Sequence, residues 1–107
     1  MIGGLDPPIA GDPPGMQRLA AELRLEADRA EGVARRVEQS MQELQFEGPA
    51  AERLRAESRA WSAQVRGHCS ELRALADMLS RSAGQVDAAQ RERARRLREH
   101  NRAPLRR

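Results

Sequence analysis

Aromatic side chains are almost absent from this 107-residue sequence, which has one Trp, one Phe and no Tyr. Large aliphatic residues are also scarce, because Leu, Ile and Val together number only 17. β-Sheets are built mainly from β-branched and aromatic residues, so this composition excludes a β-sheet domain. The chain has instead 18 Ala, 19 Arg and 16 acidic residues, a composition that favours long helices. Its length allows one small domain, which we predict to be all-α.

Cysteine, lysine and long apolar runs are lacking as well. The single Cys69 cannot form an intrachain disulfide, so nothing indicates a disulfide-built secreted fold. No stretch approaches the ~18 consecutive apolar residues of a membrane span, and residues 1–15 lack the regions of a cleavable signal peptide. All 19 non-histidine basic residues are Arg, which we attribute to a GC-rich coding genome. We expect a cytoplasmic protein, at least before any export.

The N-terminal residues 1–12 are predicted to form a Pro- and Gly-rich arm. The sequence Asp-Pro-Pro occurs at residues 6–8 and again at 12–14, where the arm ends. Asp12 is placed to cap a helix, and Pro13 suits a first helical turn. From there apolar residues step by four and three, which predicts a helix over 13–45. Leu19 and Val33 widen this stripe. The residues of this first seam are Met16, Ala20, Leu23, Ala27, Ala30, Ala34, Val37, Met41 and Leu44.

Residues 46–49 predict a tight turn, because Gly48 tolerates non-helical backbone angles and Pro49 suits the start of a new helix. Phe46 is expected to cover the end of the hairpin core. A second helix is predicted over 49–90 or beyond, so that residues 13–90 form an antiparallel helical hairpin. The second seam comprises Leu54, Ser58, Trp61, Val65, His68, Leu72, Leu75, Leu79, Ser82 and Val86.

The C-terminal residues 91–107 form an Arg-rich tail with eight Arg and two Glu. At ~1.5 Å per residue, the first helix reaches only to about residue 82 of an antiparallel partner, so the end of the chain should overhang the hairpin. Three roles remain open for this tail: a solvated end, docking on an acidic protein surface, or binding to nucleic acid or anionic lipid.

One hairpin has a single packed interface, which rarely buries enough area for a stable fold of this size. We therefore expect a homodimer or heterodimer in which two hairpins form a four-helix bundle. The nine residues of the first seam, together with Trp61, are the predicted partner interface. Because Trp61 lies on the second seam, its expected role is core packing, with partner recognition as the alternative.

No catalytic, metal or cofactor site is predicted. His68 and Cys69 are adjacent, but metal binding needs three or four ligands and His100 is far along the chain. Cys69 is expected to be a small buried residue, with an intermolecular disulfide as the alternative. Ser70 lies close to His68, yet no third residue is placed to orient a base. An enzyme is therefore not expected.

The segment Phe46-Glu47-Gly48-Pro49-Ala50-Ala51, midway between two long helices, resembles the turn of the WXG100 (ESAT-6-like) family of type VII (ESX) secretion systems. Leu54 and Trp61 in the following helix belong to this resemblance, which covers residues 13–90. Phe46 stands where the family has Trp. The family's export element, Tyr-x-x-x-Asp/Glu, has its nearest spacings here from Val86 to Gln90 and from Ala88 to Glu92, without the Tyr.

This resemblance implies a small non-enzymatic protein that is exported, or that helps to export a larger toxin, as a dimer with another helical protein. It also implies an export element presented to the secretion ATPase near the end of the second helix. The residues of this candidate docking tail are Val86, Gln90, Arg91, Glu92, Arg93, Arg95 and Arg96. The alternative is a cytoplasmic coiled-coil adaptor, or a nucleic-acid-associated protein that uses its Arg-rich tail.

Overall fold

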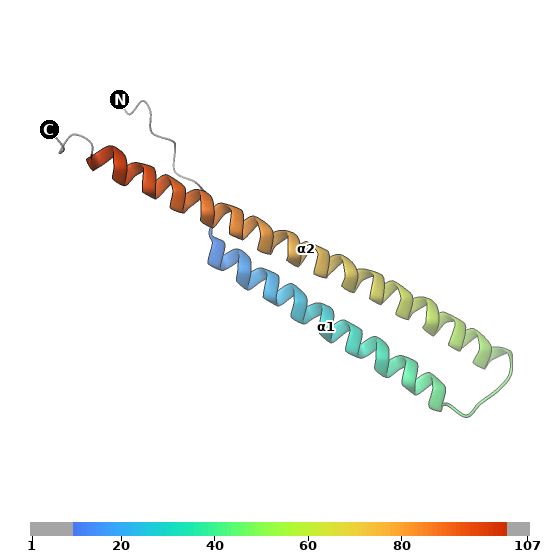
Figure 1. The fold of residues 1–107 in the computed structure, drawn as a ribbon. Coiled ribbons are helices and arrows are strands. Elements are labelled where there is room, and N and C mark those ends of the chain that lie inside the picture. The colour runs from blue at the N-terminus through green and yellow to red at the C-terminus, as the bar shows by residue number, and fades with distance from the viewer. Residues whose placement is uncertain (1–9, 103–107) are drawn as a thin grey trace.

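The computed structural model describes residues 10–102, which form two antiparallel α-helices joined by a short turn (Figure 1). Helix α1 spans Pro13–Glu43 and helix α2 spans Pro49–Arg102. They pack along each other as a hairpin and form a rod with extents of 90 × 19 × 13 Å. The predicted all-α helical hairpin is thereby confirmed. Within the described residues, no helix is both long and apolar enough to span a membrane.

Helix α1 starts where the Asp-Pro-Pro sequence predicts, with two prolines in its first turn. The predicted capping by the Asp12 side chain is wrong, because its carboxylate makes no capping hydrogen bond. That carboxylate lies over the Cα of Gly15, where a Cβ would come within 2.2 Å of an Asp12 oxygen. The backbone closes the first turn instead, with the Met16 N–H donating to the Asp12 carbonyl at 2.9 Å. A first turn that begins with prolines has few free N–H groups to cap.

The turn between the helices comprises residues 44–48. Gly48 has a φ of +109°, in the region that favours glycine, and the N–H of Glu52 donates to its carbonyl at 3.0 Å. Arg55 in the first turns of α2 reaches back over the turn. Its guanidinium donates to the carbonyls of Leu44 and Phe46 at 3.2 and 3.0 Å and lies 5.3 Å from the centre of the Phe46 ring. One arginine therefore stabilises the turn by hydrogen bonds and a cation–π contact.

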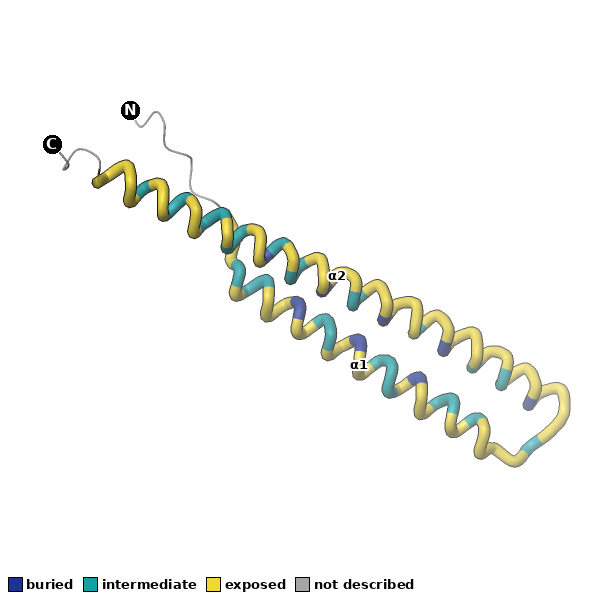
Figure 2. Tube along the Cα trace, in the orientation of Figure 1, coloured by how far each residue is buried: buried dark blue, intermediate teal, exposed yellow. Residues whose placement is uncertain are grey.

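The interface between the helices is lined by small side chains. In α1 the buried residues recur at every seventh position, at Ala20, Ala27 and Ala34. In α2 the same spacing produces Ser62, Cys69, Ala76 and Ala83, and Ala51 is also buried. Figure 2 shows these buried positions on the facing sides of the two helices. Side chains of this size allow the two helices to approach closely along their whole contact.

At every second position of the second seam, the residue that faces α1 is the one after the predicted residue. The residues that face α1 are Ser62, Cys69 and Ala76, and not their larger neighbours. Trp61, which was predicted to lie in the core, is 40% exposed, and Leu75 and His68 are exposed as well. The physical reason is that alanines in α1 hold α2 too close for a Trp or Leu between them. Val65, Leu72 and Leu79 keep their predicted inward positions and are half-buried.

Helix α2 continues past the start of α1, as the length of the helices predicts (Figure 1). The last contacts across the hairpin come from the residues before α1. The carbonyl of Gly11 accepts a hydrogen bond from the Gln90 side chain at 3.2 Å, and the Gly11 Cα lies against Val86. Residues 91–102, here named the overhang, extend as helix beyond that point. The rest of the predicted tail, and residues 1–9 of the predicted arm, lie outside the described residues.

Candidate interaction surface

One long side of the hairpin is closed by polar contacts between the helices, and is here named the ion-paired flank. Arg66 makes two hydrogen bonds of 2.6 Å to the carboxylate of Glu38. Arg73 contacts Glu31 at 3.3 Å and Asp28 at 2.9 Å. Nearer the start of α1, Arg24 contacts Asp77 at 2.9 Å and the hydroxyl of Ser80 at 3.2 Å, and the same hydroxyl donates to Gln17.

The charged groups of this flank hold one another in their ionised forms. The hydrogen bond from Arg66 lowers the pKa of Glu38 below its usual value, and the same bond raises the pKa of Arg66. Hydrogen bonds to Asp28 and Glu31 likewise raise the pKa of Arg73. Because these side chains are partly exposed to water, their main effect is to fix the register of the two helices rather than to add much stability.

The opposite side carries exposed apolar side chains and is here named the apolar flank. The arginines of the ion-paired flank that contact the opposite helix stand four positions after a buried residue, as Arg66 does after Ser62. Four residues of the apolar flank stand one position before a buried residue, as Trp61 does before Ser62, and Leu54 stands three positions after Ala51. Both spacings place the side chain on the other side of the helix. The members of the apolar flank are between 39% and 46% exposed, and comprise Leu19 and Val33 of α1 with Leu54, Trp61 and Leu75 of α2.

The predicted partner interface needs one correction. Ala20, Ala27 and Ala34 are fully buried against α2, so no partner can contact them while the hairpin is closed. Of the remaining predicted members, Leu44 and Trp61 are exposed, and five are half-buried: Met16, Leu23, Ala30, Val37 and Met41. A partner surface on this chain therefore consists of the apolar flank and the half-buried residues beside it. The sequence analysis places Leu19 and Val33 only at the edge of the first seam. They lie 14 positions apart, which is two heptads, and this spacing already indicates that they share one side of the helix.

The hairpin buries no large apolar side chain. Among the described residues, Cys69 and Ser62 are the largest fully buried side chains. The Cys69 thiol donates to the carbonyl of Ala27 across the interface at 3.2 Å. The hydroxyl of Ser62 is buried and has no hydrogen-bond partner. A core of this kind is small for a chain of this length, and the larger apolar residues stay in contact with water.

The residues considered for chemistry do not come together. His68 is exposed and lies 3.9 Å from Glu71 of its own helix, Cys69 is buried on the side that faces α1, and His100 lies on the overhang. Within residues 10–102, no group of three or more His, Cys, Asp or Glu side chains is arranged to hold a metal ion.

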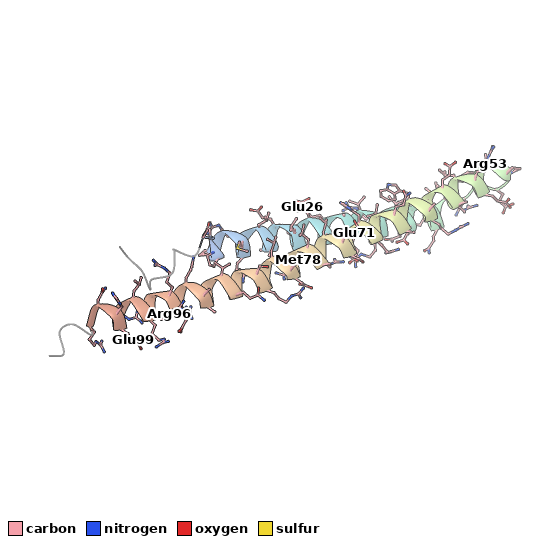
Figure 3. The ribbon with its side chains drawn as sticks, turned by 90° about the horizontal axis from the view of Figure 1, so that it is seen from above. Glu26, Arg53, Glu71, Met78, Arg96 and Glu99 are labelled. Carbon is pink, nitrogen blue, oxygen red and sulfur yellow. The ribbon has the colours of Figure 1, made fainter. Side chains whose placement is uncertain are left out.

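The overhang is a basic helix with its own ion pairs. Arg95 contacts Glu92 and also Glu99, the latter at 2.6 Å, and these contacts raise the pKa of Arg95 and lower that of Glu92. Arg91 contacts Asp87 at 2.9 Å. Figure 3 labels Arg96 and Glu99 on this segment, beyond the start of α1. Of the candidate docking tail, Val86 and Gln90 contact the segment before α1, and the later members lie on the overhang.

Comparisons with protein-family models, with curated proteins and with solved structures find no match to this chain.

Proposed function

We propose that this chain is a WXG100-like protein of a type VII secretion system that acts by binding a helical partner and not by catalysis. In this role it is exported, or it accompanies a larger toxin to the export machinery. The observation that carries the proposal is the contrast between the two flanks. One is closed by ion pairs within the chain, and the other leaves an aligned series of apolar side chains open to a partner.

The shape of the exposed surface supports a helical partner. Leu54, Trp61 and Leu75 follow one line along α2, and Leu19 and Val33 follow a parallel line along α1. Such a surface fits the side of another helix or helical hairpin, as in four-helix bundles. Exposed apolar side chains that gather on one side of a small protein favour an interaction site, and Trp is enriched among binding hot spots.

The secretion part of the proposal is supported by the resemblance at the turn. Phe46-Glu47-Gly48 separates two long antiparallel helices, and α2 continues beyond the hairpin in the region where the family has its export element. Because the chain has no Tyr, we propose that the partner supplies the aromatic part of the signal. The overhang then contributes its arginines to docking on an acidic surface of the assembled complex.

The test is export of the tagged full-length chain from a bacterium that has a type VII system. The proposal predicts the chain in the medium of the parent strain and its retention when the secretion ATPase is inactive. Leu75→Glu, which places a charge on the apolar flank, should abolish export. Leu25→Glu is the matched control, because Leu25 is 48% exposed on the outer face of α1 and away from the flank. Equal export of both variants, or export without the ATPase, would contradict the proposal.

The overhang favours a second candidate function, in nucleic-acid binding. Its twelve residues include six Arg and two Glu, and a helix of this charge can contact several phosphates. Ion pairs with Asp87, Glu92 and Glu99 already occupy Arg91 and Arg95, which weakens this candidate. Retention of the purified chain on duplex DNA, lost steeply as salt rises and lost on deletion of 91–107, would favour it over secretion.

A further inference from the structure

The ion-paired flank contains a series of arginines at seven-residue spacing along α2. Arg73 contacts Glu31 of α1 at 3.3 Å, and Arg66 contacts Glu38 at 2.6 Å. From the first pair to the second, α2 steps back by seven residues while α1 steps forward by seven, as antiparallel helices require. Each of these two arginines is therefore bound by a carboxylate of the opposite helix.

Arg59 is the next arginine of this series, and it has no such carboxylate. The same step, taken from Arg66 and Glu38, leads to Arg59 and to position 45. That position is Gln45, which carries no charge and lies after the last residue of α1. Arg59 is exposed and makes no ion pair or side-chain hydrogen bond with the residues that the structure describes. Its guanidinium is thus available to an anion from outside the chain.

A hollow of about 290 Å³ lies beside Arg59, between the two helices and near the turn. Figure 3 labels Arg53 at the same end of the hairpin. Pockets for drug-sized ligands usually measure ~300–1,000 Å³, so this hollow has room for one small group. Three residues of each helix line it, namely Glu38, Met41 and Gln42 of α1 with Arg55, Ser58 and Arg59 of α2.

Hydrogen-bond donors line the hollow on both helices. Arg55 binds the carbonyls of Leu44 and Phe46 through its Nη2 atom alone. Because a guanidinium has five N–H donors, the Arg55 side chain keeps others for a ligand. Ser58 and Gln42 add a hydroxyl and an amide group, which can donate as well. Together with the guanidinium of Arg59, these donors favour an anionic ligand.

The other residues of the lining favour a carboxylate over a phosphate. Both carboxylate oxygens of Glu38 are bound by Arg66, and this hydrogen bonding lowers the pKa of Glu38 and keeps it ionised. The charge of Glu38 in the wall repels a doubly charged phosphate more strongly than a singly charged carboxylate. Met41 provides an apolar wall that suits methylene groups beside the charged end of a ligand.

We propose that this hollow binds a carboxylate carried on a short chain of methylene groups, with Arg59 as its main binding residue and Arg55 as the second. The glutamate side chain of a peptide and a free short-chain acid both present this group. The hollow lies on the ion-paired flank, whereas the proposed partner surface is the apolar flank. The inference therefore goes beyond the proposed function, and either can fail without the other.

A titration followed by nuclear magnetic resonance tests the site in the full-length chain, through the side-chain N–H signals of its arginines. The first probe is glutamate blocked as N-acetyl and methylamide, and the second is glutamine blocked in the same way. Blocked glutamate should bind in the millimolar range, because the site is open to water. It should bind roughly tenfold more tightly than blocked glutamine, which lacks the charge. Equal binding of the two probes would overturn the inference.

Butyrate, as a free short-chain acid, distinguishes the two sources of the carboxylate. Butyrate that binds at least as tightly as blocked glutamate would assign the hollow to free acids. Butyrate that binds more weakly would assign it to the glutamate side chain of a peptide, whose backbone then adds contacts.

Replacement of the unpaired arginine tests its role. Arg59→Gln should weaken the binding of blocked glutamate roughly tenfold, because it removes the charged donor. Its melting temperature should remain that of the wild type, since no contact with the described residues is lost. Arg81→Gln is the matched control, because Arg81 is an exposed arginine of the same helix far from the hollow, and it should bind as the wild type does. Unchanged binding by Arg59→Gln, or equal weakening in both variants, would overturn the inference.

Discussion

A single leucine in the middle of the helix interface should separate the two helices. Ala27 is fully buried, and its carbonyl oxygen lies 3.2 Å from the thiol of Cys69 on the opposite helix. Ala27→Leu adds three carbon atoms where both helices present only small side chains. We therefore expect the variant to fold less stably, because the helices must move apart at their centre and lose contacts in the layers above and below.

Overpacking of a well-packed site typically costs ~1–3 kcal/mol, and the rigid close contact here places the effect near 3. For a domain of this size each 1 kcal/mol lowers the melting temperature by roughly 4–8 °C, so the expected decrease is about 12–24 °C. The measurement is thermal unfolding followed by circular dichroism at 222 nm, at one fixed protein concentration because association contributes to stability.

Ala21→Leu is the matched control, because Ala21 lies in the same helix but is exposed. It should change the free energy of unfolding by less than about 0.5 kcal/mol. If Ala27→Leu melts at or above the wild-type temperature while the control behaves as expected, the interface is not close-packed around small residues and the derivation of the two flanks is wrong.

Four further outcomes follow from individual contacts. Ser62→Ala removes a buried hydroxyl without a partner and should stabilise the protein by about 1 kcal/mol in urea unfolding. Phe46→Ala should cost only about 1 kcal/mol in the same assay, since the ring is half-buried and contributes mainly a cation–π contact with Arg55. The pKa of Glu38 is lowered in the folded state, so its contribution to the free energy of unfolding is present above about pH 4.5 and is lost as the pH falls through the lowered pKa. In Glu38→Gln the free energy of unfolding should therefore fall less steeply as the pH is lowered through this range. Deleting 91–107 should leave the helical signal per residue and the melting temperature of the hairpin unchanged.

The first helix was predictable because its apolar residues step by four and three without a competing pattern. The same stepping places Ala20, Ala27 and Ala34 on the interface, where the structure finds them buried. The position of the turn was also predictable, since Gly48 and Pro49 interrupt two helical patterns and Gly48 has the positive φ that favours glycine.

The second helix was less predictable because two overlapping patterns compete in it. Large residues such as Trp61 and Leu75 suggest one inward line, and small residues such as Ser62 and Ala76 form another, one position later. Reading the large residues as core is the usual choice, but a facing helix lined with alanine requires small residues opposite it. The choice between the two patterns is therefore decided by the residues of α1 that face α2, and not by the sequence of α2 alone.

The contacts that define the candidate surface depend on register. Glu38 and Arg66 are 28 positions apart. Heptad spacing places each of them at the edge of its own helix, but it does not determine which residue of the other helix it contacts. The bridging role of Arg55 at the turn has no sequence signal, because it depends on the path of the backbone at Leu44 and Phe46. Only the folded hairpin separates an ion-paired side from an apolar one.

The most direct test of an occupied apolar flank is the mass of the purified chain in solution, measured by light scattering at micromolar concentration. The chain itself has a mass of 11.9 kDa, and the account predicts that the folded wild type is found only at a larger mass, in a complex with a second helical chain. It predicts a single-chain mass for Trp61→Glu, which places a charge in the centre of the flank. A wild type that keeps its full helical content at the mass of one chain would contradict the account.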